Sequence, residues 1–263
     1  IRFRAIREKD GTVFEATFAR PIRQPGRGAI DELGTPADRV FRFGFYTFNI
    51  DVYIDKDRVE GSGGVALLPG RKAEIDPAFA WDRAVCLTPR PNEAREQLSK
   101  IVLDALRRTQ AEAGDGLTPE QVRELKRSIP ADMESRVWFP NRVRTRGQTV
   151  SFFVPDSFLG SPPQADWSYL IVVSGADSVQ SLGLGARYGL SEDLSSSLMI
   201  LPIEPGNWTD RFGGGKEGDA LQPPLVDIVV PAGADQGKLL RDRDPRGGRP
   251  AVLPAVVPTA KRP

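Results

Sequence analysis

Apolar and polar residues alternate with a period of two over many short segments of this chain, and this pattern predicts β-strands. Residues 11–18 alternate in this way, and residues 1–6 are the expected hairpin partner across the turn signal Asp10-Gly11. Short apolar runs between turn residues predict further strands at 136–139, 149–154, 168–174, 198–203 and 226–230. The pattern therefore predicts a mainly β chain.

The sharpest alternation lies between residues 41 and 54 and changes parity once. One predicted face carries Phe41, Phe43 and Phe45, and the next carries Phe48, Ile50, Val52 and Ile54. The change of parity predicts a bulge or bend near Tyr46 and Thr47. Strands of this apolar density are expected at the centre of a sheet rather than at its edge.

A helical period interrupts the strand pattern between residues 92 and 129. The apolar positions of the two expected helices recur at three and four residues: Leu98, Ile101, Val102 and Ala105, then Val122, Leu125 and Ile129. Thr118 and Gln121 form a capping-box signal that marks the start of the second helix. These features predict an antiparallel β-sandwich over residues 1–240 with an inserted helical hairpin at about 92–129. Residues 241–263, rich in charge, proline and glycine, are expected to form an extended C-terminal tail over the surface or around a neighbour.

Composition removes several classes of function. The 263 residues include 36 basic and 35 acidic side chains, so no global field attracts nucleic acid or anionic lipid. The absence of histidine removes serine triads and zinc hydrolysis, and the single cysteine, Cys86, excludes an internal disulfide and a thiolate metal cluster.

The longest apolar run, YLIVV at 169–173, is far shorter than a membrane span. The chain starts at Ile1 rather than methionine, which fits a cleaved export signal or a trimmed start equally well.

Acidic residues near a glycine-rich turn are the first candidate site. Asp51, Asp55 and Asp57 offer oxygen ligands of the kind that calcium takes, and Asp51 and Asp55 share one face of the predicted strand. The sequence does not follow the EF-hand loop. A structural calcium site and a solvated acidic turn are therefore both open.

Aromatic residues are the second candidate site. Trp138, Phe139 and Trp167 are the candidate ligand-binding or partner-binding residues, and Trp138, beside Phe139 and Pro140, is the one expected to be exposed. The alternative is core packing, where large aromatic side chains of a sandwich usually lie. No pair of carboxylates stands out for glycoside hydrolysis, so no catalytic residue is assigned and the chain is not expected to be an enzyme.

Several separate segments carry a resemblance to a known family. In order along the chain they read VYIDKD (52–57), LLPGRKA (67–73), VSFFVPDSFLG (150–160), DWSYLIVVSGAD (166–177) and VDIVVPAG (226–233). Together they resemble the C-terminal module of bacterial glucodextranases over about residues 41–253. The resemblance implies a β-sandwich similar to DOMON-type, immunoglobulin-like and related carbohydrate-binding modules. It also implies polysaccharide attachment or association with the cell envelope.

The likeness to the wider DOMON group also suggests haem binding, because some members of that group bind haem and some accompany electron-transfer proteins. Axial ligation there uses Met and His, and this chain has only Met133 and Met199, so haem is not expected.

The sequence thus predicts a non-catalytic, exported binding module located in the periplasm or at the cell surface. The first hypothesis is an accessory subunit that docks on protein partners in a membrane-associated complex, such as an electron-transfer assembly. The alternative is a carbohydrate-binding module for cell-surface or extracellular polysaccharide.

Overall fold

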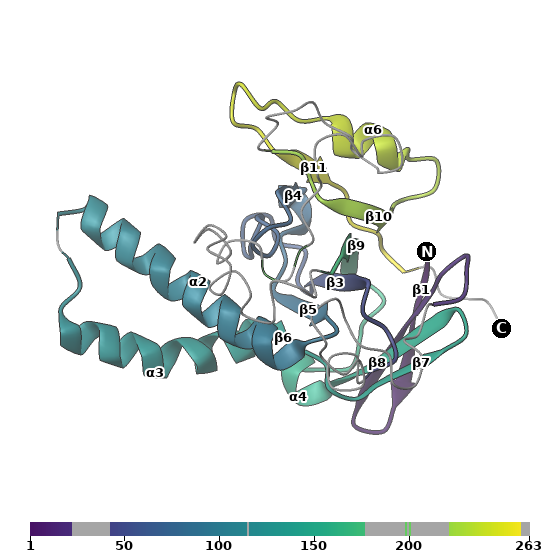
Figure 1. Ribbon diagram of the computed structural model, residues 1–263. Helices are drawn as coiled ribbons and strands as arrows, with labels where there is room; N and C mark the ends of the chain where they lie inside the picture. The colour runs from purple at the N-terminus through teal and green to yellow at the C-terminus, as the bar shows by residue number, and fades with distance from the viewer. Residues whose placement is uncertain (23–42, 115, 177–197, 199, 201–220, 259–263) are drawn as a thin grey trace, which may run out of the picture.

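The strands of this protein form two large sheets and one small sheet (Figure 1). The computed structural model describes residues 1–22, 43–114, 116–176, 198, 200 and 221–258. The large sheets have the strand orders β1-β2-β8-β7 and β10-β9-β3-β5-β6, and the small sheet pairs β11 with β4. The two large sheets pack face to face as an open sandwich, which confirms the predicted fold class.

The four-stranded sheet is antiparallel throughout. Its strands are β1 (Arg2–Glu8), β2 (Gly11–Thr17), β7 (Val143–Arg146) and β8 (Thr149–Pro155). The hairpin of β1 and β2 confirms the prediction from the Asp10-Gly11 signal, and β2 then pairs along its whole length with β8. Strand β7 was not predicted, because its alternate residues are arginines and its apolar content is low.

The five-stranded sheet forms the middle layer of the molecule. Its strands are β3 (Phe48–Asp55), β5 (Arg83–Leu87), β6 (Val137–Trp138), β9 (Ser168–Gly175) and β10 (Leu225–Val229). All pairs are antiparallel except β5 with β6. Every residue of β3 is buried, because the strand is central in the sheet and both sheet faces are covered. This confirms the prediction that 48–54 is a central strand.

The predicted strand before β3 is wrong in the part that the structure describes. Phe43 and Phe45 are buried, but they lie in a turn and loop rather than in a strand. The reason is Gly44, whose φ of 79° is left-handed and interrupts an extended backbone. The change of parity coincides with a bend at Thr47, directly before β3, which confirms the bend alternative of the prediction rather than a bulge within a strand. Phe41 and residues 201–203 of a later predicted strand lie outside the described residues.

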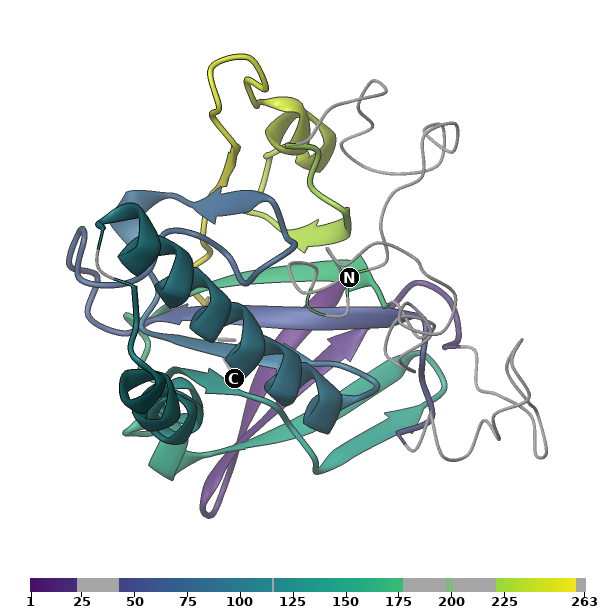
Figure 2. The ribbon, with the colours of Figure 1, turned by 60° about the vertical axis from the view of Figure 1, so that its left-hand side comes forward.

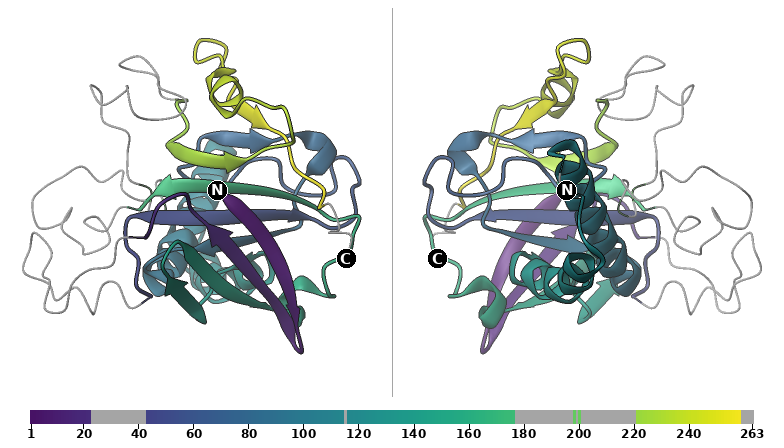
Figure 3. Two further views of the ribbon diagram at one scale, coloured as in Figure 1. Left: turned by 90° about the vertical axis from the view of Figure 1, so that its right-hand side faces the viewer. Right: turned by 90° about the vertical axis from the view of Figure 1, so that its left-hand side faces the viewer.

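The middle sheet has other elements packed on both of its faces (Figure 3). Two apolar cores lie on these opposite faces. The face carrying Ile50, Val52 and Ile54 packs against the four-stranded sheet. The opposite face, carrying Tyr53 and Cys86, packs under the helical hairpin and the small sheet. The alternation of β3 thus sends its aliphatic residues into one core and its polar residues into the other.

The predicted helical hairpin is present, and it projects from the end of the sheet that holds β5 and β6 (Figure 1). It consists of α2 (Pro91–Glu112) and α3 (Pro119–Arg136), somewhat longer than the predicted 92–129. Thr118 and Gln121 form the predicted reciprocal capping box. Helix α2 crosses in front of the sheet strands in Figure 2, but only the base of the hairpin is buried, at Ala94, Leu98, Leu103, Ile129 and Met133. In the described part of the chain no helix combines the length and apolarity that a membrane span requires.

The C-terminal segment adds a second small layer. Strand β11 (Ala251–Leu253) pairs in parallel with β4 (Ala73–Ile75), next to α6 (Gln236–Arg241). Ala251 and Leu253 are fully buried, so part of the predicted extended tail completes the core. The remaining short elements are η1 (Pro77–Phe79) and α4 (Asp156–Leu159).

Candidate functional site

A buried ion pair between Arg71 and Asp51 lies on the hairpin side of the middle sheet. Both side chains are at most 1% exposed, and the guanidinium binds the carboxylate through two nitrogens, Nε to Oδ2 at 2.6 Å and Nη2 to Oδ1 at 2.9 Å. Nη1 donates to the carbonyl oxygens of Pro69 and Leu198, both at 2.9 Å. Each guanidinium nitrogen therefore has an acceptor.

The environment of this pair perturbs three groups. Burial opposes the charge of Arg71, but the Asp51 carboxylate outweighs it, and the net pKa of Arg71 is raised. Burial in turn raises the pKa of the Cys86 thiol and of the Tyr53 hydroxyl well above their ordinary values, with the Asp51 charge adding to both effects. The pair thus fixes Asp51 as a structural ion and keeps its two neighbours neutral.

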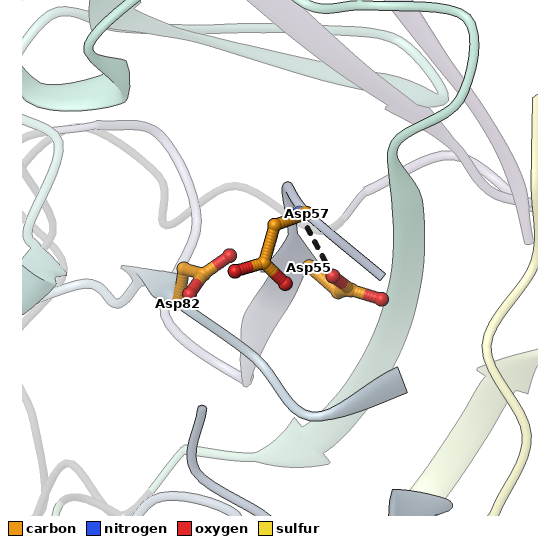
Figure 4. Close-up of side chains that lie close together, drawn as sticks. All are labelled: Asp55, Asp57 and Asp82. Atoms are coloured by element: carbon orange, nitrogen blue, oxygen red, sulfur yellow. Dashed lines mark hydrogen bonds between the residues drawn. The ribbon is translucent and has the colours of Figure 1, made fainter. Parts of the chain in front are cut away.

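This pairing changes the predicted set of calcium ligands. Four residues of extended strand, about 13 Å, separate Asp51 from Asp55. The structure instead gathers Asp55 and Asp57 with Asp82, with one oxygen of each within 4.8 Å of the others (Figure 4). Asp82 was missed in the sequence because it precedes a different strand, β5, and only strand pairing brings it beside Asp55.

The three carboxylates already accept hydrogen bonds from the turn. Asp55 accepts from the backbone N–H groups of Asp57 and Arg58 at 3.2 and 2.7 Å and from Ser168 Oγ at 3.1 Å. Asp82 accepts from the N–H of Lys56 at 2.8 Å. These bonds hold the turn after β3, and the calcium role of the cluster stays a prediction.

The three predicted aromatic residues lie inside or at the edge of the cores. Phe139 is 2% exposed and Trp167 is 3% exposed, so neither offers an open ring face. Trp138 is half-buried and packs on Phe158, with ring centroids 5.6 Å apart. Trp138, the predicted exposed residue, is thus only partly exposed, because it packs against the core between the two large sheets, while Phe139 lies in the core on the opposite face of the middle sheet. A binding role for these residues stays a prediction.

The outer face of the four-stranded sheet carries a different set of side chains. Strand register places them in rows that run across the four strands. One row is mostly apolar: Ile6, Val13 and Phe153 lie side by side on β1, β2 and β8. Arg142, directly before β7, is bonded to Phe153 through the backbone and ends this row. The neighbouring row, two residues along each strand, is polar and consists of Arg4, Glu15, Ser151 and Arg144.

A pocket of about 340 Å³ opens on this face. Its lining includes Ile6, Val13, Phe153, Glu15, Ser151 and Arg144. This volume is at the lower end of the roughly 300–1,000 Å³ that is typical of small-ligand sites. The combination of an apolar floor with a few polar groups is also typical of such sites.

Ion pairs position the charged residues around the pocket. Arg142 lies 3.3 Å from Glu8, and its guanidinium sits 4.6 Å from the centre of the Phe153 ring. Glu15 Oε2 accepts from Arg4, while Glu15 Oε1 has no hydrogen-bond donor among the described residues. None of these residues was singled out from the sequence. The signal that could have found them is the alternation of arginine in 142–146 together with glutamate in the first hairpin.

Comparison with known families gives a match over almost the whole chain. The family described as the C-terminal binding module, SLH-like, of glucodextranase matches residues 1–257. No curated protein matches the chain.

Proposed function

The chain belongs to the family of the C-terminal, SLH-like binding module of glucodextranase, and on this premise we propose that it binds polysaccharide without catalysis. The family is a binding module rather than a catalytic domain, which confirms the resemblance read from the sequence. SLH-like binding modules are typical of cell-surface or exported proteins. Export to the periplasm or cell surface is part of the same proposal.

The observation that carries the proposal is the pocket on the outer face of the four-stranded sheet. A sugar ring has an apolar face and a rim of hydroxyl groups. The row of Ile6, Val13 and Phe153 offers an apolar surface, and Glu15, Ser151 and Arg144 offer acceptors and donors beside it. The pocket therefore offers apolar side chains to the apolar face of a sugar ring and polar side chains to its hydroxyl groups.

The test is retention by polysaccharide. The purified chain is run on native gels that contain soluble dextran or other soluble polysaccharides, and it is mixed with insoluble cell-wall polysaccharide and sedimented. We expect slower migration or co-sedimentation with at least one polysaccharide. Unchanged migration in every gel and no co-sedimentation overturn polysaccharide binding.

A second candidate is docking on a protein partner of the cell envelope, and the helical hairpin favours it. The outer part of α2 and α3 projects beyond the sandwich, and Leu106 there is 38% exposed. A projecting, charged helical arm suits contact with another protein. The test is co-purification from envelope membranes in mild detergent, compared between the native chain and an Arg107→Glu, Arg123→Glu variant. Loss of a stoichiometric partner in the variant supports docking, and identical co-purification opposes it.

A further inference from the structure

We propose that a row of four side chains across the outer face of the four-stranded sheet binds a phosphate group. This threonine row consists of Arg2 on β1, Thr17 on β2, Thr149 on β8 and Arg146 on β7, which strand pairing places side by side. None of the four residues lines the pocket on the same face. The site therefore goes beyond the proposed polysaccharide binding and does not depend on it.

The outer face of this sheet is basic, although the whole chain has a formal net charge of only +1. Its charged side chains are Arg2, Arg4, Arg142, Arg144, Arg146, Glu8 and Glu15. Glu15 pairs with Arg4, and Glu8 pairs with Arg142. Among the residues that the structure describes, the guanidinium groups of Arg2, Arg144 and Arg146 have no hydrogen-bond or ion-pair partner. Two of these three unpaired cations stand in the threonine row.

Two hydroxyl groups occupy the middle of the threonine row. Thr17 Oγ1 and Thr149 Oγ1 are 3.1 Å apart and share a hydrogen bond. Whichever hydroxyl donates in that bond, the other one keeps its own proton and can donate it to a ligand. The bond that this second hydroxyl accepts also strengthens it as a donor. The centre of the row therefore offers a hydrogen-bond donor between the two arginines.

The two arginines flank the hydroxyl pair at opposite ends of the row. Adjacent strands are about 4.8 Å apart, so the Cα atoms of Arg2 and Arg146 are about 14 Å apart, with both threonines between them. Both arginines are exposed, and their long stems let the guanidinium groups lean over the neighbouring strands. Guanidinium donors match the geometry of phosphate oxygens, and a phosphate has enough oxygens to accept from both arginines and from a hydroxyl at once.

The neighbouring row of the sheet does not repel an anion held there. That row lies about 7 Å away along the strands and contains Glu15, the carboxylate that follows Thr17 most closely in the strand register. Arg4 pairs with this carboxylate, and Arg144 adds an unpaired cation at the other end of the same row. The field at the threonine row is therefore positive, and it is strongest at low salt because exposed charges are screened.

The same chemistry is offered by soluble phosphate and by the headgroup of an anionic phospholipid, so the experiment uses both on the whole chain. Inorganic phosphate is titrated into the isotope-labelled chain at low salt, and the backbone amide signals are followed by NMR. Sedimentation is then measured with vesicles of phosphatidylcholine alone and with vesicles that also contain phosphatidylglycerol.

The site variants are Arg2→Met, Arg146→Met and Thr149→Val. The last removes a hydroxyl group without changing the net charge. Arg123→Met and Arg127→Met are matched controls, because their side chains are exposed on α3, at 68% and 79%, away from the sheet. Urea midpoints are measured for every variant to establish that it is folded.

We expect inorganic phosphate to shift the amide signals of Thr17 and Thr149. Each arginine variant is expected to bind phosphate about fivefold more weakly, the upper end of the effect of an exposed ion pair. The two arginines are far enough apart for their effects to multiply, so the double variant should bind about 25-fold more weakly. Thr149→Val should also cost about fivefold through its lost donor, and the controls should stay within about twofold.

The two probes identify the source of the phosphate. Binding of inorganic phosphate without a preference for phosphatidylglycerol vesicles supports a soluble phosphate ligand. Sedimentation with phosphatidylglycerol vesicles that is lost in the arginine variants supports a lipid headgroup. The site is overturned if the native chain responds to neither probe, or if the site variants bind as well as the controls. Full binding by Thr149→Val, with loss in the arginine variants, would indicate a diffuse charge effect and would also overturn the threonine row as a site.

Discussion

Replacing Arg71 by methionine tests the energetic role of the buried ion pair. Methionine keeps the length and much of the apolar stem but removes the charge that faces Asp51. The Asp51 carboxylate is then left unpaired at 1% exposure, and the carbonyl groups of Pro69 and Leu198 lose their donor. Removing one partner of a buried pair costs about 3–5 kcal/mol. Against a total stability of about 5–15 kcal/mol for a domain, this is a large loss.

The assay is equilibrium unfolding in urea, with the slope of the transition compared between variants. Arg249→Met is the matched control, because Arg249 pairs with Asp242 at 2.8 Å but their side chains are 50% and 73% exposed. An exposed pair contributes about 0–1 kcal/mol, so the control is expected to change little. Arg71→Lys keeps the charge but cannot form the paired bonds, and it should fall between the two.

A double variant separates the ion pair from the carbonyl contacts. Changing Arg71 to methionine together with Asp51 to leucine removes both charges, so the penalty of an unpaired buried carboxylate disappears. The carbonyl groups of Pro69 and Leu198 still lack a donor, and we expect a residual loss of about 1–3 kcal/mol. A loss below about 1 kcal/mol for Arg71→Met, with an unchanged slope, would refute this description of the pair.

Three further predictions concern other parts of the molecule. The raised pKa values of Cys86 and Tyr53 keep the thiol and the phenol neutral in the folded chain. In the unfolded chain these groups lose their protons above pKa values of about 8.5 and 10. The folded chain is therefore fully stabilised below those pH values and loses stability as the pH rises above them. The free energy of unfolding should therefore fall by up to about 1.4 kcal/mol per pH unit for each group. In the Cys86→Ala variant only Tyr53 remains, so the fall in stability should begin at about pH 10. Identical urea curves for the native chain and the variant from about pH 8 to 11 would contradict this. If the acidic cluster binds calcium, millimolar Ca²⁺ should raise the thermal unfolding midpoint of the native chain but not the midpoint of the Asp82→Asn variant. An unchanged midpoint of the native chain would exclude calcium binding. Gly11→Ala places a Cβ within 2.4 Å of the Val154 carbonyl and 2.5 Å of the Phe153 ring, so a loss of about 1–3 kcal/mol in the free energy of unfolding is expected, and a stability equal to that of the native chain would show that the ring can move away.

The local elements of this protein could be read from sequence wherever one short-range signal dominates. The Asp10-Gly11 turn signal gave the first hairpin, and the capping box at Thr118 and Gln121 gave the start of α3. The alternation of 48–54 also assigned each side chain of β3 to the correct face. The strand predicted over Phe43 and Phe45 failed, because alternation of buried residues does not report the left-handed backbone of Gly44.

The candidate sites depended on contacts between residues far apart in the chain. Asp51 looked like a metal ligand from its neighbours in sequence, but only the folded chain brings Arg71 against it. Asp82 joins Asp55 because β5 pairs with β3, and a strand pairing is not encoded in either strand alone. The pocket on the outer sheet needs β1, β2, β8 and β7 in register, with 125 residues (18–142) between the end of β2 and the start of β7.

The sequence by itself determined the mainly β class, the helical hairpin and the family. Its composition also excluded chemistry based on histidine or on a thiolate cluster. These features could be read directly because composition and local periodicity do not depend on which distant residues come together. Tertiary structure decided that Asp51 is a buried structural ion, that Trp167 is a core residue and that the outer sheet holds the pocket. The physical reason is that burial and side-chain pairing depend on which distant strands come together. The same carboxylate is a free ligand on an open strand and a fixed partner when a guanidinium is packed against it.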